Sequence, residues 1–184
     1  FAQITQPPNS DFILIPGHSS EGRDYIPLGF FSADYKSNNS CLIVATSQPW
    51  LFGILHSKMH MVWVDAVGGK LETRYRYSAK LCYNTFPFPD ISEKQKLTIN
   101  EYVFAILDER AKFTEKTMAW LYNPETMPKE LKQAHQNLDR AIEEIYRMGN
   151  PFTSDAERLE HLFKRYDEMI KKDTLFAKQK KIRK

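Results

Sequence analysis

Charged and aromatic residues alternate between Gly68 and Ser78, and this segment has the residue types and spacing to do chemistry. In an extended strand Glu72, Arg74 and Arg76 point to one side and the residues between them to the other. Arginine pairs with guanine through two hydrogen bonds, and a carboxylate accepts a hydrogen bond from the cytosine amino group. The row therefore predicts a strand that reads base edges. The alternative is a solvated strand face with a cross-strand ion pair.

Three lysines of the first 90 residues are candidates for contacts with DNA phosphates, which are made alike on all sequences. The candidates are Lys36, Lys58 and Lys70. The tyrosines of the alternating segment, Tyr75 and Tyr77, are expected to pack beneath the strand. The chain shows no self-contained set of catalytic residues.

A pair of histidines is the strongest candidate for a metal site. His56 and His60 are four residues apart and could share one helix face. Residue 57 is serine, where a metalloprotease motif needs glutamate beside the first histidine. The motif is therefore incomplete. A small metal hydrolase that uses His56 and His60 is the third hypothesis, and it predicts stoichiometric zinc in the purified protein.

The composition indicates a globular protein. The chain has 184 residues, of which 42% are hydrophobic and 13% aromatic, and no apolar run reaches the length of a membrane span. Cys41 and Cys82 lie in apolar, strand-like segments and are expected to be buried free thiols, which fits a cytoplasmic setting. The first residues include no initiator methionine and no signal pattern, and they are typical of a cut inside a longer protein.

Charge is distributed unevenly along the chain. Residues 1–90 carry 7 basic and 7 acidic residues, and residues 91–184 carry 19 basic and 16 acidic, which accounts for the net charge of +3. Much of the excess lies in the tail after Asp173, where a solvated end and a phosphate contact are both compatible with the pattern.

The first 90 residues predict a mixed α/β part. Apolar runs predict strands at 12–16, 25–31 and 41–45, with the segment 17–23 as a loop. A helix is expected next, capped by Ser47 and ended by the glycines at 68 and 69, with Ser57 as a point where it breaks and restarts.

Helical spacing dominates after residue 90. It predicts three helices, at 92–113, 128–148 and from Ser154 onward, with a linker at 121–128. Ser92 is a plausible cap of the first, and Ser154 with Glu157 forms a capping box for the third. The sequence thus predicts an α+β fold, with a mixed part at 1–90 and a three-helix part with a basic tail at 91–184.

Several segments of the chain match one protein family in order. They are Ser57–Trp63, Gly68–Ser78, Tyr83–Pro87, Leu121–Pro128 and Ala134–Asp139. In these segments the chain resembles single-chain restriction–modification enzymes of the MmeI type and their solitary DNA methyltransferase relatives. The resemblance covers most of residues 12–172. It implies the C-terminal part of a target recognition domain followed by the helical C-terminal domain.

The resemblance implies a fragment that recognises double-stranded DNA for an adenine-N6 methyltransferase. The methyltransferase domain, which binds S-adenosylmethionine, would lie upstream in the same polypeptide, and some members add a nuclease that uses Mg²⁺. No cofactor, catalytic residue or membrane contact is expected in this fragment. By resemblance the segment after the double glycine reads bases, which again selects Glu72, Arg74 and Arg76.

A non-enzymatic interaction module is the second hypothesis. In it the three helices dock a partner beside a structural α/β part, and Trp120 and Tyr122 serve as anchors if they are exposed. Core packing is the other use of both side chains. This hypothesis predicts DNA binding that is independent of sequence, or none.

Overall fold

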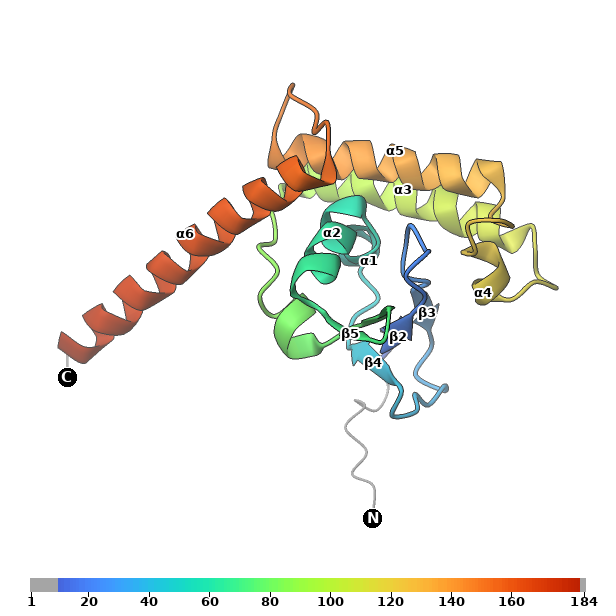
Figure 1. Cartoon of the computed structure of the whole chain (residues 1–184), viewed down its shortest axis with the longest axis horizontal. Coiled ribbons are helices and arrows are strands. Elements are labelled where there is room, and N and C mark those ends of the chain that lie inside the picture. The colour runs from blue at the N-terminus through green and yellow to red at the C-terminus, as the bar shows by residue number, and fades with distance from the viewer. Residues whose placement is uncertain (1–9, 183–184) are drawn as a thin grey trace, which may run out of the picture.

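The computed structural model describes residues 10–182, and for Leu71 and residues 173–182 it describes the backbone alone. Two small antiparallel sheets stand beside α1 and α2, the paired helices α3 and α5 lie along this body, and α6 extends away from it (Figure 1). The elements are β1 (Phe12–Pro16), β2 (His18–Ser19), β3 (Gly29–Phe31), β4 (Cys41–Val44), α1 (Pro49–Leu55), α2 (Lys58–Val67), β5 (Gly69–Leu71), β6 (Arg74–Arg76), the π-helical turn η1 (Ala79–Tyr83), α3 (Glu93–Ala111), α4 (Met118–Leu121), α5 (Lys129–Tyr146) and α6 (Asp155–Ile182). The predicted α+β class is confirmed.

Gly17 joins the two sheets, whose strand orders are β3-β1-β4 and β2-β6-β5. Its N–H donates to the Ser40 carbonyl at 2.9 Å, and its own carbonyl accepts from the Tyr77 N–H at 2.9 Å. A Cβ at this position would lie 2.7 Å from the Ser40 oxygen. The close approach of the two backbones therefore requires glycine.

Some strand and helix boundaries differ from the expectation. The strand expected at 25–31 is reduced to β3, because Pro27 lacks an N–H and the residues before it turn into the core. The loop expected at 17–23 contains β2, which pairs with β6. Cys82 is buried as predicted, but it lies in the helical turn η1, while Cys41 in β4 is half-buried. The N-cap of α1 is Gln48, one residue after Ser47, with no side-chain cap bond.

The predicted break in the first helical region is confirmed. Ser57 separates α1 from α2, and its hydroxyl accepts from the His60 N–H at 3.4 Å as an N-cap. Gly53 lets α1 cross α3 closely, because a Cβ there would lie 2.7 Å from Ile99 Cγ2 and 2.9 Å from Val103 Cγ2. The first half of the chain is thus fitted directly against the second.

The three helices expected after residue 90 are present as α3, α5 and α6. Ser92 caps α3 in a complete capping box with Gln95. At α6 the Ser154 hydroxyl accepts from the Glu157 N–H at 3.2 Å, but the Glu157 carboxylate accepts from the Thr153 N–H at 2.7 Å, one residue earlier than the predicted box. The short helix α4 was not expected. The side chains of the basic tail lie outside the described residues.

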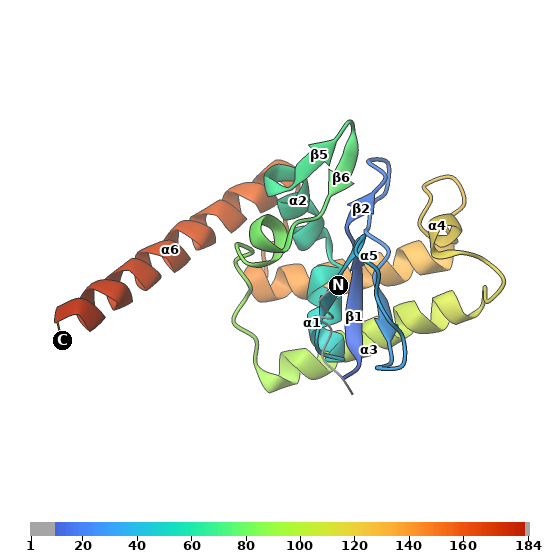
Figure 2. The ribbon, with the colours of Figure 1, turned by 90° about the horizontal axis from the view of Figure 1, so that it is seen from below.

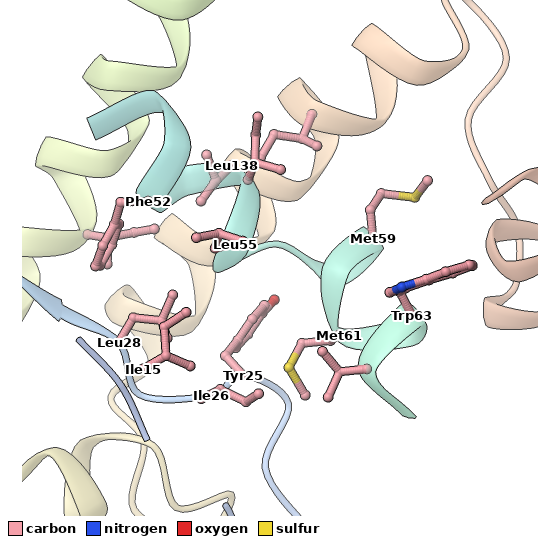
Figure 3. Packing of buried hydrophobic residues seen from close by; sticks show 14 of the residues in the cluster. Ile15, Tyr25, Ile26, Leu28, Phe52, Leu55, Met59, Met61, Trp63 and Leu138 are labelled. Carbon is pink, nitrogen blue, oxygen red and sulfur yellow. The ribbon is translucent and has the colours of Figure 1, made fainter. Parts of the chain in front are cut away.

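One hydrophobic core runs through both halves of the chain. Figure 3 shows side chains of β1, the segment before β3, α1, α2 and α5 in contact, among them Ile15, Tyr25, Leu55 and Leu138. Ile99, Val103 and Ile106 of α3 belong to the same cluster. The helices of the second half therefore share their buried face with the mixed part, which fixes that part in place.

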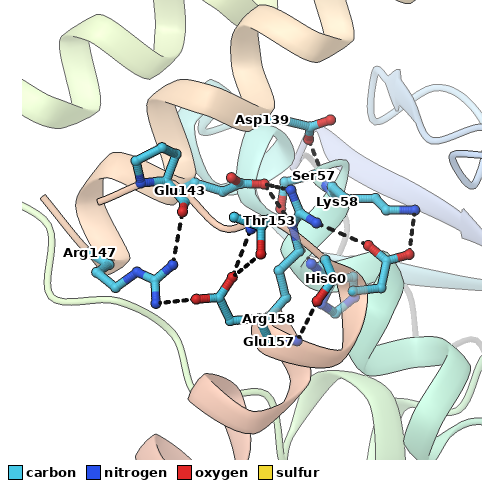
Figure 4. Close-up of polar contacts among 12 residues, drawn as sticks. Ser57, Lys58, His60, Asp139, Glu143, Arg147, Thr153, Glu157 and Arg158 are labelled. Atoms are coloured by element: carbon cyan, nitrogen blue, oxygen red, sulfur yellow. Dashed lines mark hydrogen bonds and ion pairs between the residues drawn. The ribbon is translucent and has the colours of Figure 1, made fainter. Parts of the chain in front are cut away.

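Asp139 of α5 connects the halves through buried hydrogen bonds. Its Oδ1 accepts from the Lys58 N–H at the start of α2 at 2.6 Å (Figure 4). Its Oδ2 accepts from the Tyr25 hydroxyl at 2.7 Å. Burial raises the pKa of Asp139 to about 6. Nearby, Arg158 of α6 donates to Glu143 of α5 at 2.8 Å.

A second buried cluster gathers around Arg110 of α3. Its Nε donates to the Tyr122 hydroxyl at 2.6 Å and its Nη1 to the Leu28 carbonyl at 2.9 Å. Tyr122 is also 2.8 Å from His135 Nε2, and the ring of His56 contacts both. Tyr122 is 2% exposed, so it belongs to the core and is not a surface anchor; Trp120 is half-buried against Phe113.

Candidate nucleic-acid interface

The charged segment forms a hairpin instead of the single strand expected from its alternation. β5 and β6 pair antiparallel with Leu71 opposite Arg74, so Glu72 and Thr73 form the turn. Glu72 has φ 59°, in the left-handed region that glycine and asparagine prefer. The expectation missed this turn because neither residue is a usual turn former. Glu72 therefore leaves the strand row and sits at the tip of the hairpin.

Arg74 and Arg76 remain on one face of β6 because they are two residues apart. Both are exposed. Arg74 reaches the Glu72 carboxylate at 3.7 Å, and these side chains are 62% and 77% exposed. Among the described residues Arg76 makes no ion pair. The face thus presents two guanidinium groups to solvent.

β2 adds His18 to the same face. His18 lies directly opposite Arg76, and cross-strand partners point to the same side of a sheet. Its side chain is exposed. A strand of two residues gives no alternation pattern, so the sequence offered no signal for this neighbour beyond the polar residue itself. Figure 2 shows the hairpin beside β2, projecting away from α3.

The other face of this sheet is turned toward the body and carries Ser19, Lys70 and Tyr75. Lys70 Nζ is 3.1 Å from Asp65 of α2 and 5.8 Å from the centre of the Tyr75 ring. The bond to Asp65 raises the pKa of Lys70. Lys70 therefore lies on the opposite face from Arg74 and Arg76, with its charge already matched.

Three contacts fix the position of the hairpin. The Tyr77 hydroxyl, just after β6, is 2.8 Å from His60 Nε2 of α2, and both side chains are buried as expected for Tyr77. At the tip, the Thr73 hydroxyl donates to Glu21 at 2.8 Å. At the base, a Cβ on Gly68 would lie 2.4 Å from the Val64 carbonyl, so α2 can enter β5 this tightly only through glycine.

The two remaining lysines differ in their surroundings. Lys36 is exposed in the connection between β3 and β4, where its Nζ donates to the Ala33 carbonyl at 3.3 Å. Lys58, at the first position of α2, pairs with Asp155 of α6 at 3.1 Å. Lys58 therefore links two helices, and Lys36 has the more accessible charge.

An open pocket lies behind the hairpin, between Tyr75, α2 and the start of α6, with a volume of about 320 Å³. Acidic groups from three elements line it, including Asp24, Asp65 and Asp155. These carboxylates pair with Lys132, Lys70 and Lys58 respectively. Glu21 also lines the pocket and accepts from Thr73 at the hairpin tip, so the carboxylates of this pocket already have partners within the protein.

The histidine pair does not form a joint site. His56 is the C-cap of α1 in the Arg110 cluster, and His60 is on α2 beside Tyr77 and Phe86. Burial lowers the pKa of His60 to about 3, and burial with the neighbouring His135 lowers the pKa of His56 well below its usual range. Among the side chains that the structure describes, those of residues 10–70 and 72–172, no three metal-ligating groups gather into a cluster. Both histidines are core residues of separate helices.

No helix in the described part of the chain is long and apolar enough to span a membrane.

An α+β fold that presents arginines on an exposed hairpin, with its core shared by a helical half, defines a recognition module. The chain belongs to the MmeI family: residues 1–90 match the target recognition domain of MmeI and residues 91–174 its C-terminal domain.

Two similar proteins place this module in a longer chain. The DNA methyltransferase A of Bacillus subtilis (strain 168) is 50% identical over 160 residues, which are 87% of this chain and 18% of that protein. A solved structure of the type IIL restriction–modification enzyme MmeI in complex with DNA superposes with a TM-score of 0.86 at 44% identity, over 91% of this chain and 22% of the other. The chain therefore spans about a fifth of the relatives that it matches.

Proposed function

We propose that this chain reads the sequence of double-stranded DNA for an S-adenosylmethionine-dependent adenine-N6 methyltransferase. The observation that carries the proposal is the outer face of β6, where Arg74 and Arg76 stand exposed with His18 alongside. A guanidinium in a major groove bonds guanine O6 and N7 together. The names of the two relatives, a DNA methyltransferase and an enzyme solved with DNA, support it.

The spacing of the two arginines matches the separation of base pairs that lie two steps apart. Residues two apart on a strand are separated by about 6.6 Å, and two base-pair steps measure about 6.8 Å. Arg74 and Arg76 would then address base pairs two steps apart. Glu72, at the hairpin tip beside Arg74, would accept from a cytosine amino group or orient the Arg74 guanidinium.

Phosphate contacts would set the register in which the hairpin enters the groove. Lys36 is the best placed of the three candidates because its charge is exposed. Lys58 and Lys70 would have to exchange Asp155 and Asp65 for a phosphate. Their part in binding would therefore be smaller and more dependent on salt.

The catalytic steps belong to the remainder of the polypeptide in this proposal. An upstream methyltransferase domain would bind S-adenosylmethionine and receive one adenine flipped from the duplex, while this module holds the flanking sequence. A nuclease domain, where the parent has one, would use Mg²⁺. The cytoplasm is the proposed location.

Selection of randomised duplex DNA tests the proposal, with the wild-type chain, Arg74→Ala and Arg76→Ala compared at two salt concentrations. Each substitution should relax the preference at one base pair by roughly 1–3 kcal/mol and leave the others intact. Arg140→Ala, an exposed arginine on α5, is the matched control and should leave the selected motif unchanged. Uniform weakening by both hairpin variants would contradict base reading, because a phosphate contact weakens all sequences alike.

A further inference from the structure

An apolar groove lies at the edge of the first sheet, between β3, α1 and α3. It has a volume of about 240 Å³, and Phe30, Phe31, Pro49, Phe104 and Leu107 line it together with Asp11 and two serines. β3 is an edge strand of its sheet. Asp11 supplies the charge on this lining, so the groove suits an apolar protein surface better than a phosphate backbone.

Large apolar side chains extend this surface beyond the groove. Phe104 is 51% exposed and Leu97 65% exposed, and their spacing of seven residues places both on the same outer face of α3. Tyr35, 60% exposed, meets Phe31 edge-on with ring centres 5.5 Å apart. Glu101 is exposed between Leu97 and Phe104 on this face, so the surface is apolar side chains around one carboxylate. Exposed apolar side chains grouped beside a groove mark an interaction site.

The position where the chain enters the fold identifies the partner. Phe12, the first residue of β1, stacks on Phe31 with ring centres 5.9 Å apart, and Asp11 lines the groove itself. The chain covers 18% of the length of one relative and 22% of the length of the other. Its second half matches a domain described as C-terminal, so in such proteins most of the polypeptide precedes this module. The polypeptide that precedes this module in such proteins would therefore reach it beside the groove.

We propose that the groove and the outer face of α3 dock the methyltransferase part of the same polypeptide, through an apolar anchor that enters between Phe31 and Phe104. This inference rests on the proposed function, because it takes the upstream part to be a methyltransferase. The hairpin projects away from α3 (Figure 2), so docking here leaves the DNA-reading face open. Docking at this surface would fix the position of the methyltransferase part relative to the hairpin while both contact one duplex.

A photo-crosslinking experiment on the full-length parent protein tests the docking surface. Phe104→p-benzoylphenylalanine replaces one aromatic side chain by another at an exposed position, which avoids a folding defect. Irradiation should give crosslinks within one molecule to peptides of the methyltransferase part. The matched control is Met148→p-benzoylphenylalanine, at a position 82% exposed in the turn after α5, and it should give none to that part.

A second variant pair measures how much Phe104, at the groove, contributes to docking. With the photo-reactive residue at position 97, the additional change Phe104→Glu should lower the crosslink yield about tenfold, as expected for loss of a buried aromatic anchor. Met148→Glu should leave the yield unchanged. Crosslinks that join two copies of the protein, or an absence of crosslinks from both α3 positions, would overturn the proposal.

The outcome is separable from that of the proposed function. Crosslinking to the upstream part needs no DNA. The crosslinking result therefore tests the docking inference even if the selection experiment enriches no motif. Conversely, loss of sequence-specific DNA binding by Phe104→Glu in the 184-residue chain would show that this face contacts DNA and would also overturn the docking inference.

Discussion

The hairpin β5–β6 and the interface between the two halves of the chain use similar side chains in opposite ways. In the interface, Arg110 is half-buried and donates to the Tyr122 hydroxyl and the Leu28 carbonyl. On the hairpin, Arg76 has no ion-pair partner among the described residues and Arg74 reaches only Glu72, at 3.7 Å. The guanidinium that is paired inside the protein holds the two halves together, and the exposed guanidinium groups of the hairpin are available to a ligand.

The energetic consequence differs just as sharply between the two regions. Removing one partner from a buried polar network leaves the other desolvated and unpaired, which costs several kcal/mol. An exposed ion pair contributes about 0–1 kcal/mol. Substitutions in the interface should therefore change stability and spare specificity, and substitutions on the hairpin should do the reverse.

Acidification should destabilise the fold through its buried histidines, two of which lie at the interface between the two halves. The pKa of His60 is lowered to about 3 in the folded chain, and burial also lowers the pKa values of His56 and His135. As pH falls below about 6.5 the unfolded chain binds protons that the folded chain excludes, so stability is lost. His60, with its pKa lowered to about 3, should cost roughly 2 kcal/mol between pH 7 and pH 5, and His56 and His135 should add to this loss in the same direction.

Asp139 acts in the opposite direction. Its pKa is raised to about 6, so as pH falls toward about 4 the folded chain binds a proton that the unfolded chain does not, and stability is gained. This offsets roughly 1 kcal/mol of the loss. Urea unfolding at pH 7 and pH 5 should show a net fall in the free energy of unfolding of more than the roughly 1 kcal/mol that His60 and Asp139 leave together, because His56 and His135 add to the loss.

Asp139→Ala should produce the largest effect of a single substitution. It removes the acceptor of both the buried Tyr25 hydroxyl and the partly buried Lys58 N–H, and it leaves both donors without this partner. The free energy of unfolding at pH 7 should fall by roughly 3 kcal/mol in urea titrations. Asp139→Asn, which keeps one acceptor oxygen, should cost less. Equal losses in both variants would show that the side chain acts through packing alone.

Tyr77→Phe tests the connection between the two regions. The change deletes the hydroxyl that is 2.8 Å from His60 Nε2 and leaves this buried nitrogen unpaired. Thermal unfolding should report a loss of roughly 1–2 kcal/mol. The matched control is Tyr75→Phe on the same strand, whose half-buried ring makes no hydrogen bond to a described residue. A control variant as unstable as Tyr77→Phe would contradict a specific role for the Tyr77–His60 contact.

The parts of the fold that could be predicted from sequence are those governed by local rules. The helices, the break at Ser57, the cap at Ser92 and the helix end at Gly68 follow from capping and steric preferences that a few neighbouring residues determine. The burial of Tyr77 followed from alternation. The arginine row followed too, since residues two apart share a strand face wherever the strand begins.

The parts that could not be predicted depend on tertiary contacts. Glu72 turns the chain with φ 59° although no glycine or asparagine marks the position, and β2 exists only because β6 pairs with it. The sequence therefore did not predict that His18 lies beside Arg76 on the candidate face. Lys58 and Lys70 looked like accessible charges until α6 and α2 supplied Asp155 and Asp65 as partners, which no local pattern indicates.

Glu72→Gly should give the smallest change in stability and the sharpest test of the comparison. Glycine adopts φ 59° without the strain of a side chain, so the free energy of unfolding should rise by roughly 0.5 kcal/mol, the relief of strain being reduced by the greater entropy of glycine in the unfolded chain. Thr73→Gly should instead destabilise, because Thr73 has no positive φ and donates to Glu21. The same Glu72→Gly variant removes the carboxylate beside Arg74, so DNA selection should show altered preference at one base pair. A gain in stability together with a loss of discrimination would establish that the strained turn is retained for the ligand, and unchanged discrimination would assign Glu72 to the turn alone.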